Sequence, residues 1–229
     1  MELPVSDSPR LVLLRHGDTA WASEGRHTGR TDVPLTPAGE AEARRAGDRL
    51  HGLDPALVLC SPLQRARRTA ELAGYPDAVV DADLAEWDYG PVEGRTSAEV
   101  GAVLGRPYEI FRDGVAVPGL SVPGLAAPGL SVPGLAAPGL SAPPSSGESL
   151  AQVRARAERV LQRVRPVLAD GGTVLAVAHG HLLRVLATAW LEVDATFGAH
   201  LELGCAAVCA LGRSHHLPTI EAWNLVDAG

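Results

Sequence analysis

Short apolar segments that end at polar residues constrain the fold of this chain more than any other feature. Residues 11–14 are all Leu or Val and lead directly into Arg-His-Gly at 15–17, and residues 173–178 lead into His-Gly at 179–180. A continuous apolar run of this length is typical of a strand buried on both faces, as in parallel sheets that helices cover on both sides. Further strands are expected over residues 56–60, 78–80, 201–211 and 219–225.

Helix-start signals stand between these strands. Thr36 and Pro37 combine a capping side chain with proline at the first helical position, and good helix formers follow to Leu50. A capping residue followed three positions later by Gln or Glu occurs at Ser61–Gln64, Thr96–Glu99 and Ser149–Gln152. A further helix is expected from about 180 to 191. Alternating strands and helices predict an α/β fold, a three-layer sandwich with a mostly parallel central sheet flanked by helices.

One segment departs from this alternation. Residues 118–142 are five copies of a pentapeptide, PGLSV, PGLAA, PGLSV, PGLAA and PGLSA. Pro-Gly favours a turn, and a proline at every fifth position interrupts both helices and strand ladders. We expect a mobile, turn-rich insertion in one domain that spans residues 1–229, and its regular leucines leave a lid or docking role open.

Charge and composition narrow the class of protein. The formal net charge of −7 argues against a nucleic-acid binder, and no apolar run approaches the roughly 20 residues of a membrane span. Cys60, Cys205 and Cys209 are too few for a disulfide framework, and core packing is favoured over a metal or redox role. No secretory signal is visible, so a cytoplasmic location is expected.

The polar residues at the strand ends are the candidates for chemistry. A neutral imidazole at His16 can attack phosphorus, and the guanidinium of Arg15 can chelate two phosphate oxygens. Arg65 adds a second cation in the first turn of a helix, where backbone N–H groups also point outward. His179 and Gly180 repeat the arrangement at another strand end. Each residue alone is as well explained by structure, but together they describe a pocket for a tetrahedral dianion at the carboxyl edge of the sheet.

Six segments in order resemble one known family. They are LVLLRHGDTAW, GRHTGRTDVPLTPAG, CSPLQRARRTA, LAEWDYGPVEG, SSGES and VAHGHLLR, and they resemble the blocks of the histidine phosphatase superfamily, also called phosphoglycerate mutase-like. The segments cover most of the chain except the pentapeptide array and the termini. The sequences of the first and fourth blocks are most similar to those of bacterial broad-specificity acid phosphatases of the family.

The resemblance implies a role for each matching residue. His16 would be the phosphorylated nucleophile, Arg15, Arg65 and His179 would form the phosphate pocket, and Glu86 would donate a proton to the leaving oxygen and then activate water. The substrate-binding residues it implies are Arg15, Thr28, Gly29, Arg65 and Gly180. Glu86 would otherwise be taken for a surface glutamate, and Thr28 and Gly29 for a turn.

Two departures favour hydrolysis over a mutase reaction. Ala22 stands where the glycolytic mutases have an asparagine, and Ser97 where they have a substrate-binding lysine. Arg26, Arg30 and Arg95 are left as substitute cations. Three functions therefore compete: a phosphomonoesterase, a phosphoglycerate-type mutase, and a non-catalytic phosphate-ligand binder. The first predicts a small-molecule phosphomonoester as substrate, with no cofactor and no metal. It leaves the oligomeric state open, a homodimer included.

Overall fold

A mixed six-stranded sheet forms the centre of the computed structural model, which describes residues 8–120 and 145–226. The strand order is β3-β2-β4-β1-β5-β6. The strands are β1 (Leu11–Arg15), β2 (Leu57–Cys60), β3 (Val79–Val80), β4 (Val174–Ala178), β5 (Val208–Ser214) and β6 (Leu217–Leu225). The pairs β3–β2, β2–β4 and β4–β1 are parallel, whereas β5 joins β1 and β6 in antiparallel pairs. The predicted α/β fold with a mostly parallel sheet is confirmed.

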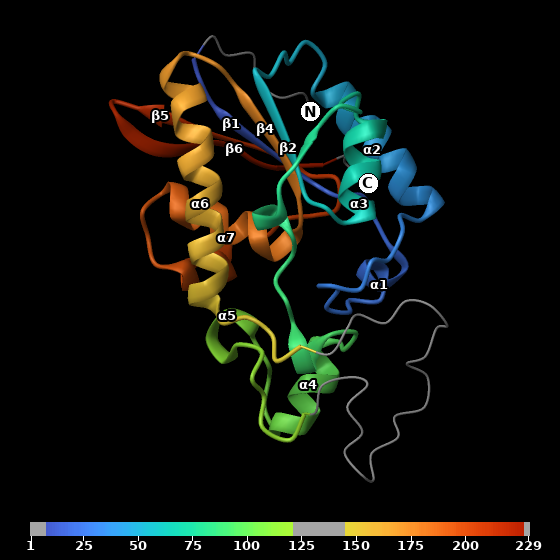
Figure 1. The fold of residues 1–229 in the computed structure, drawn as a ribbon. Helices are drawn as coiled ribbons and strands as arrows, with labels where there is room; N and C mark the ends of the chain where they lie inside the picture. Colours follow the sequence, from blue (N-terminus) through green and yellow to red (C-terminus); the bar gives the residue numbers. More distant parts are fainter. Residues whose placement is uncertain (1–7, 121–144, 227–229) are drawn as a thin grey trace.

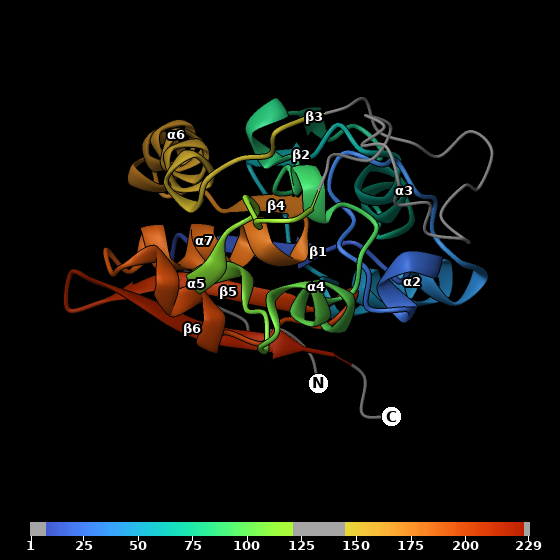
Figure 2. The ribbon, with the colours of Figure 1, turned by 90° about the horizontal axis from the view of Figure 1, so that it is seen from below.

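Helices cover both faces of this sheet. Figures 1 and 2 show α6 and α7 on one side, with α2 and α3 on the other, while α4 and α5 lie beyond one end of the strands. The α-helices are α1 (Ala20–Ser23), α2 (Pro37–Arg49), α3 (Gln64–Leu72), α4 (Ser97–Leu104), α5 (Ile110–Asp113), α6 (Leu150–Ala169) and α7 (Gly180–Trp190). Three short 3₁₀ helices are η1 (Ala82–Leu84), η2 (Gly90–Val92) and η3 (Ala195–His200).

Strand β1 explains why its sequence is apolar at every position. Leu11 and Leu13 are fully buried in the core on the α6–α7 side, and Val12 and Leu14 are fully buried in the core on the α2–α3 side. Successive side chains of a strand point to opposite faces, so a strand between two helical layers is apolar throughout. Such a strand places the residue after its last position at the carboxyl edge of the sheet.

Most of the predicted helix starts are confirmed, and one is wrong. Capping boxes begin α4 and α6, and the Thr36 hydroxyl accepts from the Gly39 N–H at the start of α2. Helix α3 begins at Gln64 instead of just after Ser61. Its first N–H donates to the Asp32 carboxylate at 2.8 Å, so a distant loop caps this helix. The Ser61 hydroxyl pairs instead with the ring of His179.

The strand predicted over residues 201–211 begins later than expected. Ala206 has a φ of 50°, a left-handed conformation that ends an extended segment, and β5 starts at Val208. The irregular residues before it turn the carbonyl of Leu203 toward Arg15, whose Nη1 donates to it at 2.5 Å. This stretch therefore contributes to the site.

Two further predictions concern the pentapeptide array and membrane spans. Of the pentapeptide array, only residues 118–120 are described, and Leu120 is partly buried against the core. The expected character of the rest of the array lies outside the described residues. Within residues 8–120 and 145–226, none of the helices is both long and apolar enough to cross a bilayer.

Candidate active site

The two strand-end histidines lie side by side. Arg15 pairs with Ala178 in the parallel register of β1 and β4, and the N–H of His16 donates to the Ala178 carbonyl at 2.9 Å. The register therefore brings the ring of His16 to the ring of His179, with 5.1 Å between centroids. The sheet edge that was predicted to hold the pocket does gather these residues.

His16 is held in the tautomer that a nucleophile requires. Its Nδ1 lies 2.7 Å from the carbonyl oxygen of Gly17. Because a carbonyl only accepts, Nδ1 carries the proton and Nε2 keeps its lone pair. Burial, together with the charges of Arg65 and Arg15, holds the pKa of His16 well below its usual value. The imidazole is therefore neutral at pH 7.

Gly17 is needed because the backbone after His16 packs closely against a neighbouring helix. A Cβ at Gly17 would collide with the carbonyl oxygen of Gly39, in the first turn of α2. The Gly17 N–H donates to the hydroxyl of Thr69 on α3 at 3.1 Å. The glycine thus lets the segment after His16 pack between two helix backbones, which fixes the position of the imidazole.

His179 has a similar setting but different partners. The Nε–H of Arg65 donates to its Nδ1 at 3.2 Å, so Nε2 carries the proton and donates to the Ser61 hydroxyl at 2.7 Å. The ring is fully buried, and burial and the charge of Arg65 hold its pKa well below the usual value. Both ring nitrogens of this neutral histidine are already engaged within the protein.

Arg65 connects His179 to the loop that follows α1. The guanidinium is fully buried and donates to the carbonyl oxygens of Thr31 at 3.0 Å, Thr28 at 2.9 Å and Gly29 at 3.0 Å. Burial lowers the pKa of Arg65, although nearby carboxylates oppose this effect. Four of its five N–H groups are used in these contacts and in the bond to His179.

Of the two arginines predicted for the phosphate pocket, Arg15 has fewer of its N–H groups engaged within the protein. It is half-buried, and its only side-chain hydrogen bond among the described residues goes to the Leu203 carbonyl. Its Nε is buried with no acceptor in the described part of the chain. A Cβ at Gly180 would lie 3.4 Å from Cζ of Arg15, so the guanidinium rests on the start of α7. Arg15 therefore keeps donors that can bind an anion.

Glu86 lies at the N-terminus of α7. One carboxylate oxygen accepts from the N–H groups of Trp87 at 2.8 Å and Leu182 at 2.9 Å, and the other accepts from the His181 N–H at 3.1 Å. The residue is buried, not the surface glutamate that its sequence alone would suggest. Its charge acts on Arg65 and on His27, so it belongs to the same group of residues as His16 and His179.

The predicted substrate contacts of Thr28 and Gly29 are partly used inside the protein. The Gly29 N–H donates to both carboxylate oxygens of Glu93, at 3.0 and 3.1 Å, and the Thr28 hydroxyl donates to the Arg26 carbonyl at 3.1 Å. Glu93 is a buried carboxylate that sequence reasoning missed, and burial raises its pKa. Both predicted residues nevertheless lie against Arg65 through their carbonyls.

A wall of aromatic rings beside Glu86 was also missed. His27 lies 5.1 Å from Tyr89 and 5.8 Å from Tyr108 between ring centroids, and it stacks at 6.1 Å on His181. The pKa values of His27 and His181 are lowered mainly by burial, so both rings are neutral at pH 7. Helical spacing could have indicated His181, since it follows Gly180 in the first turn of α7.

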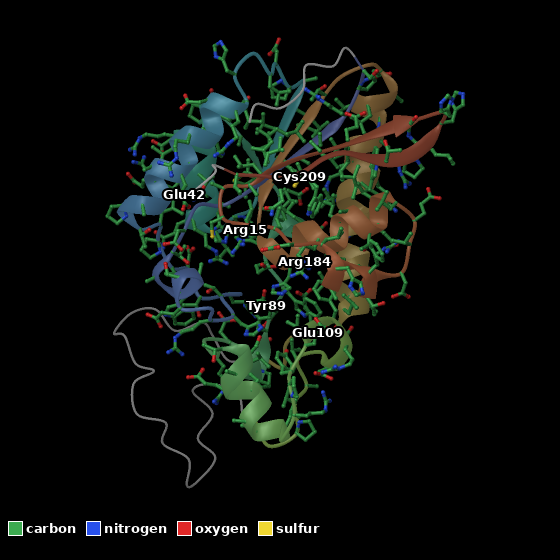
Figure 3. All side chains as sticks on the ribbon, turned by 180° about the vertical axis from the view of Figure 1, so that it is seen from behind. Arg15, Glu42, Tyr89, Glu109, Arg184 and Cys209 are labelled. Atoms are coloured by element: carbon green, nitrogen blue, oxygen red, sulfur yellow. The ribbon has the colours of Figure 1, made fainter. Side chains whose placement is uncertain are left out.

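Arg184 on α7 is a further residue that sequence reasoning missed. Its Nε donates to the Gly198 carbonyl at 2.7 Å, and its Cζ lies 4.7 Å from the ring centroid of Phe111. Figure 3 shows Arg15, Arg184 and Tyr89 around the same part of the molecule. Position 184 is four residues after Gly180, so the period of the predicted helix was the available signal.

The cations that the sequence offered as substitutes are engaged elsewhere. Arg26 pairs with Glu24 and Glu99, and Arg30 pairs with Asp88. The Nε of Arg95 donates to the Pro91 carbonyl at 3.2 Å. None of the three is part of the His16–His179 group of contacts that the described residues make.

A separate pocket of about 640 Å³ lies between α2, α3 and the segment before β3. Its charged residues include Glu40, Arg68 and Glu71, and Arg68 pairs with both carboxylates. Arg67 also lines the pocket and forms no ion pair among the described residues, but the pocket holds none of the strand-end histidines. Among the described residues, no cluster of three or more His, Cys, Asp or Glu side chains could hold a metal ion.

The model of the histidine phosphatase superfamily (branch 1) matches residues 11–119 and 135–226. An acid phosphatase of Mycobacterium tuberculosis is 34% identical over 218 residues, which are 94% of this chain and 92% of that protein. Sedoheptulose 1,7-bisphosphatase of Saccharomyces cerevisiae is 30% identical over 88% of this chain and 72% of its own length. A 2,3-bisphosphoglycerate-dependent phosphoglycerate mutase of Thermobifida fusca is 38% identical over 77% and 75%.

Solved structures show the same similarity. The structure of an open reading frame product from Mycobacterium tuberculosis aligns with a TM-score of 0.78 at 31% identity, covering 95% of this chain and 98% of that one. The two chains therefore share their fold over nearly the whole length of each.

Proposed function

Because this chain belongs to the histidine phosphatase superfamily (branch 1), we propose that it is a phosphoric monoester hydrolase. It releases phosphate from small phosphorylated molecules through a covalent phosphohistidine on His16. The observation that carries the proposal is the state of His16, a buried neutral imidazole whose Nδ1 proton is bound to the Gly17 carbonyl. Its Nε2 lone pair lies beside Arg15, which has an unused donor.

The first step forms the covalent intermediate. The Nε2 lone pair attacks phosphorus, a nitrogen–phosphorus bond forms, and the bond from phosphorus to the ester oxygen breaks. Arg15 and Arg65 stabilise the charge on the phosphoryl oxygens. The departing alkoxide takes a proton from the carboxyl group of Glu86 and leaves as the alcohol.

The second step regenerates the enzyme. Glu86, now a carboxylate, takes a proton from water, whose oxygen attacks phosphorus and displaces Nε2. Inorganic phosphate leaves, and His16 and Glu86 return to their starting states. His179 and Arg65, bound to each other, to Ser61 and to the loop at residues 28–31, keep the pocket in place through both steps. The acid phosphatase relative, which matches 94% of this chain, supports hydrolysis as the outcome.

The test of the intermediate is chemical. Wild-type protein quenched in acid and in base after mixing with a phosphomonoester should carry a phosphate that is acid-labile and base-stable, as a phosphoramidate is. Peptide mapping should place it on His16. A phosphate that survives acid but not base would indicate phosphoserine or phosphothreonine, and one that is lost in both would indicate an acyl phosphate. Either result would overturn the phosphohistidine.

A mutase remains the second candidate, because a mutase relative is 38% identical. A mutase must retain its substrate and exclude water while the phosphohistidine waits. We expect steady phosphate release from several monoesters and negligible conversion of 3- to 2-phosphoglycerate, even with 2,3-bisphosphoglycerate as primer. Interconversion much faster than phosphate release would favour the mutase.

We also propose a cellular location and a domain organisation for this protein. The three cysteines are free thiols, with Cys60 and Cys209 buried, as is usual in a reducing compartment, so we place the protein in the cytoplasm. We further propose that residues 1–229 form one domain with the pentapeptide array inserted in it.

A further inference from the structure

Arg184 is a partly buried cation with unused donors. Among the described residues it forms no ion pair, and Nε is its only hydrogen-bonding atom. Glu109 acts on its charge, but the Glu109 carboxylate accepts from the N–H groups of Phe111 and Arg112 as the cap of α5. A guanidinium that gives up part of its hydration usually gains a carboxylate in return. Here the four Nη hydrogens find no acceptor in the described part of the chain.

The position of Arg184 relates it directly to the reacting residues. Residues four apart on a helix lie on one face, about 5–6 Å apart at Cβ, so Arg184 lies one turn beyond Gly180. The guanidinium of Arg15 rests on Gly180. Burial is the main cause that lowers the pKa of Arg184, and the charge of Arg15 adds to it, whereas Tyr89, Glu109 and Glu86 oppose it. An anionic group beside Arg184 would relieve this cost.

The neighbouring polar rings do not supply another charge. His181 and His27 are neutral, and the His181 ring is bound to the Tyr89 hydroxyl at 2.6 Å. The stem and guanidinium of Arg184 are held by Phe111 below and by Gly198 at Nε. These contacts preorganise the Nη groups, so little side-chain entropy is lost when they bind.

We propose that Arg184 is the specificity-determining residue of this site. Its Nη groups bind a second acidic group of the substrate, a carboxylate or a second phosphate, while Arg15 binds the phosphate that is transferred. Guanidinium groups bind carboxylate and phosphate oxygens in a bidentate manner, so both chemistries fit the same donors. The preferred substrates are then phosphomonoesters with a second anionic group a few bonds from phosphorus. This inference rests on the proposed phosphatase function.

The test compares pairs of substrates that differ only in the second charge. 3-Phosphoglycerate and glycerol 3-phosphate share a skeleton and differ by a carboxylate. Fructose 1,6-bisphosphate and fructose 6-phosphate differ by a phosphate. Phosphate release gives kcat/KM for each, and the ratio within a pair measures the preference for the second anion. We expect wild-type protein to prefer the doubly anionic member of at least one pair, and that pair identifies the group bound.

The decisive variant is Arg184→Met, which keeps an apolar stem against Phe111 and removes the charge. The preference ratio should fall about 10-fold or more, as expected when a charged hydrogen bond is lost, and mainly through KM. Arg184→Lys should retain part of the preference. The matched control is Arg213→Met. Arg213 also lies over an aromatic ring, 5.6 Å from that of Trp190, and also donates to a carbonyl, that of His216, but it lies in an exposed part of β5. Its ratio should match wild type.

Failure of this inference can be told from failure of the proposed function. If wild-type protein hydrolyses both members of each pair and Arg184→Met leaves both ratios unchanged, the subsite is wrong and the phosphatase stands. If no ester is hydrolysed, the phosphatase is wrong. Calorimetric titration of 3-phosphoglycerate into wild-type protein and Arg184→Met still tests the subsite, because equal Kd values would overturn it. Should Arg184→Met fail to fold, Arg184→Gln carries the same prediction.

Discussion

Two strand ends meet at this site, and they differ in how fully their hydrogen bonds are made. At the end of β1, the ring of His16 makes one hydrogen bond among the described residues, to the Gly17 carbonyl, and Arg15 has a buried Nε without an acceptor there. At the end of β4, both nitrogens of His179 are bound within the protein, to Arg65 and Ser61. The β1 end keeps capacity for a ligand, whereas the β4 end is saturated.

The difference teaches that a shared sequence pattern does not assign a shared role. Both ends read as an apolar strand followed by histidine and glycine, and both histidines are buried and neutral. The two histidines differ in the group that binds Nδ1 of the ring. In His16 it is a backbone carbonyl, and in His179 it is the guanidinium of Arg65. We therefore assign the nucleophile to the β1 end and a supporting role to His179 at the β4 end, and four predictions test the site on this basis.

The largest effect is expected from His16→Ala. Turnover of p-nitrophenyl phosphate should fall to background, because His16 is the residue proposed to take up the phosphoryl group. The melting temperature should stay close to that of wild type, since among the described residues the ring of His16 hydrogen-bonds to the neighbouring Gly17 alone. Full activity in His16→Ala would end the covalent reading and with it the division between the two ends.

Glu86→Gln should give the next largest effect. It tests the proposed proton donor, which is bound at the N-terminus of α7. The change keeps the shape and removes the proton, so esters with poor leaving groups should slow by about 10²–10⁴-fold. p-Nitrophenyl phosphate should slow much less, because its phenolate leaves without a proton.

Glu93→Gln is the matched control for the acid. Glu93 is also a buried glutamate that accepts backbone N–H groups, from Gly29 and Thr31. Any loss in this variant should be the same for both classes of ester. Equal losses for both classes in Glu86→Gln would assign the acid to another residue.

The sequence predicted the fold and several residues of the site, but it predicted few of the hydrogen bonds that those residues make. Apolar runs located β1 and β4, and the parallel register that follows from them brings His16 to His179. Contacts between segments that are far apart in the chain could not be predicted from the sequence. Nothing local indicates that Asp32 caps α3 or that Ser61 binds His179, because both depend on how loops far apart in the chain fold together.

The resemblance to a family indicated only residues in the short motifs that its members share. Arg184 and His27 were missed because their importance comes from helix phase and ring stacking, not from a short motif. The start of β5 was misplaced because the left-handed Ala206 carries no sequence signal, alanine being a poor indicator of positive φ.

His179→Ala should have a moderate effect, on stability more than on chemistry. The change leaves the Arg65 Nε–H and the Ser61 hydroxyl without their partner in a buried site. Such a loss costs about 1–3 kcal/mol of unfolding free energy, and each kcal/mol lowers Tm by about 2–4 °C in a chain of this size. Thermal unfolding of His179→Ala beside His16→Ala measures the contrast. Equal Tm values for the two variants would show that the β4 end is not the supporting one.

The smallest effect is the pH dependence of stability, in which the two ends should behave alike. Burial is the first cause of the low pKa of both His16 and His179, with nearby arginines adding to it. Above the unfolded-state pKa of about 6.5, both states of each residue are neutral and contribute no slope. As pH falls below that value the unfolded chain takes up protons that the folded chain refuses, so stability declines with decreasing pH. Each such histidine contributes up to about 1.4 kcal/mol per pH unit.

Denaturant unfolding between pH 7 and pH 5 should therefore show a falling free energy of unfolding, and either His16→Ala or His179→Ala should make the decline shallower by a similar amount. His215→Ala, in the exposed turn after β5, is the control and should keep the wild-type slope. A slope that changes in His179→Ala alone would mean that His16 becomes charged in the folded protein over this range. The nucleophile would then be lost in mild acid, and the β1 end would differ from the β4 end in protonation as well as in hydrogen bonding.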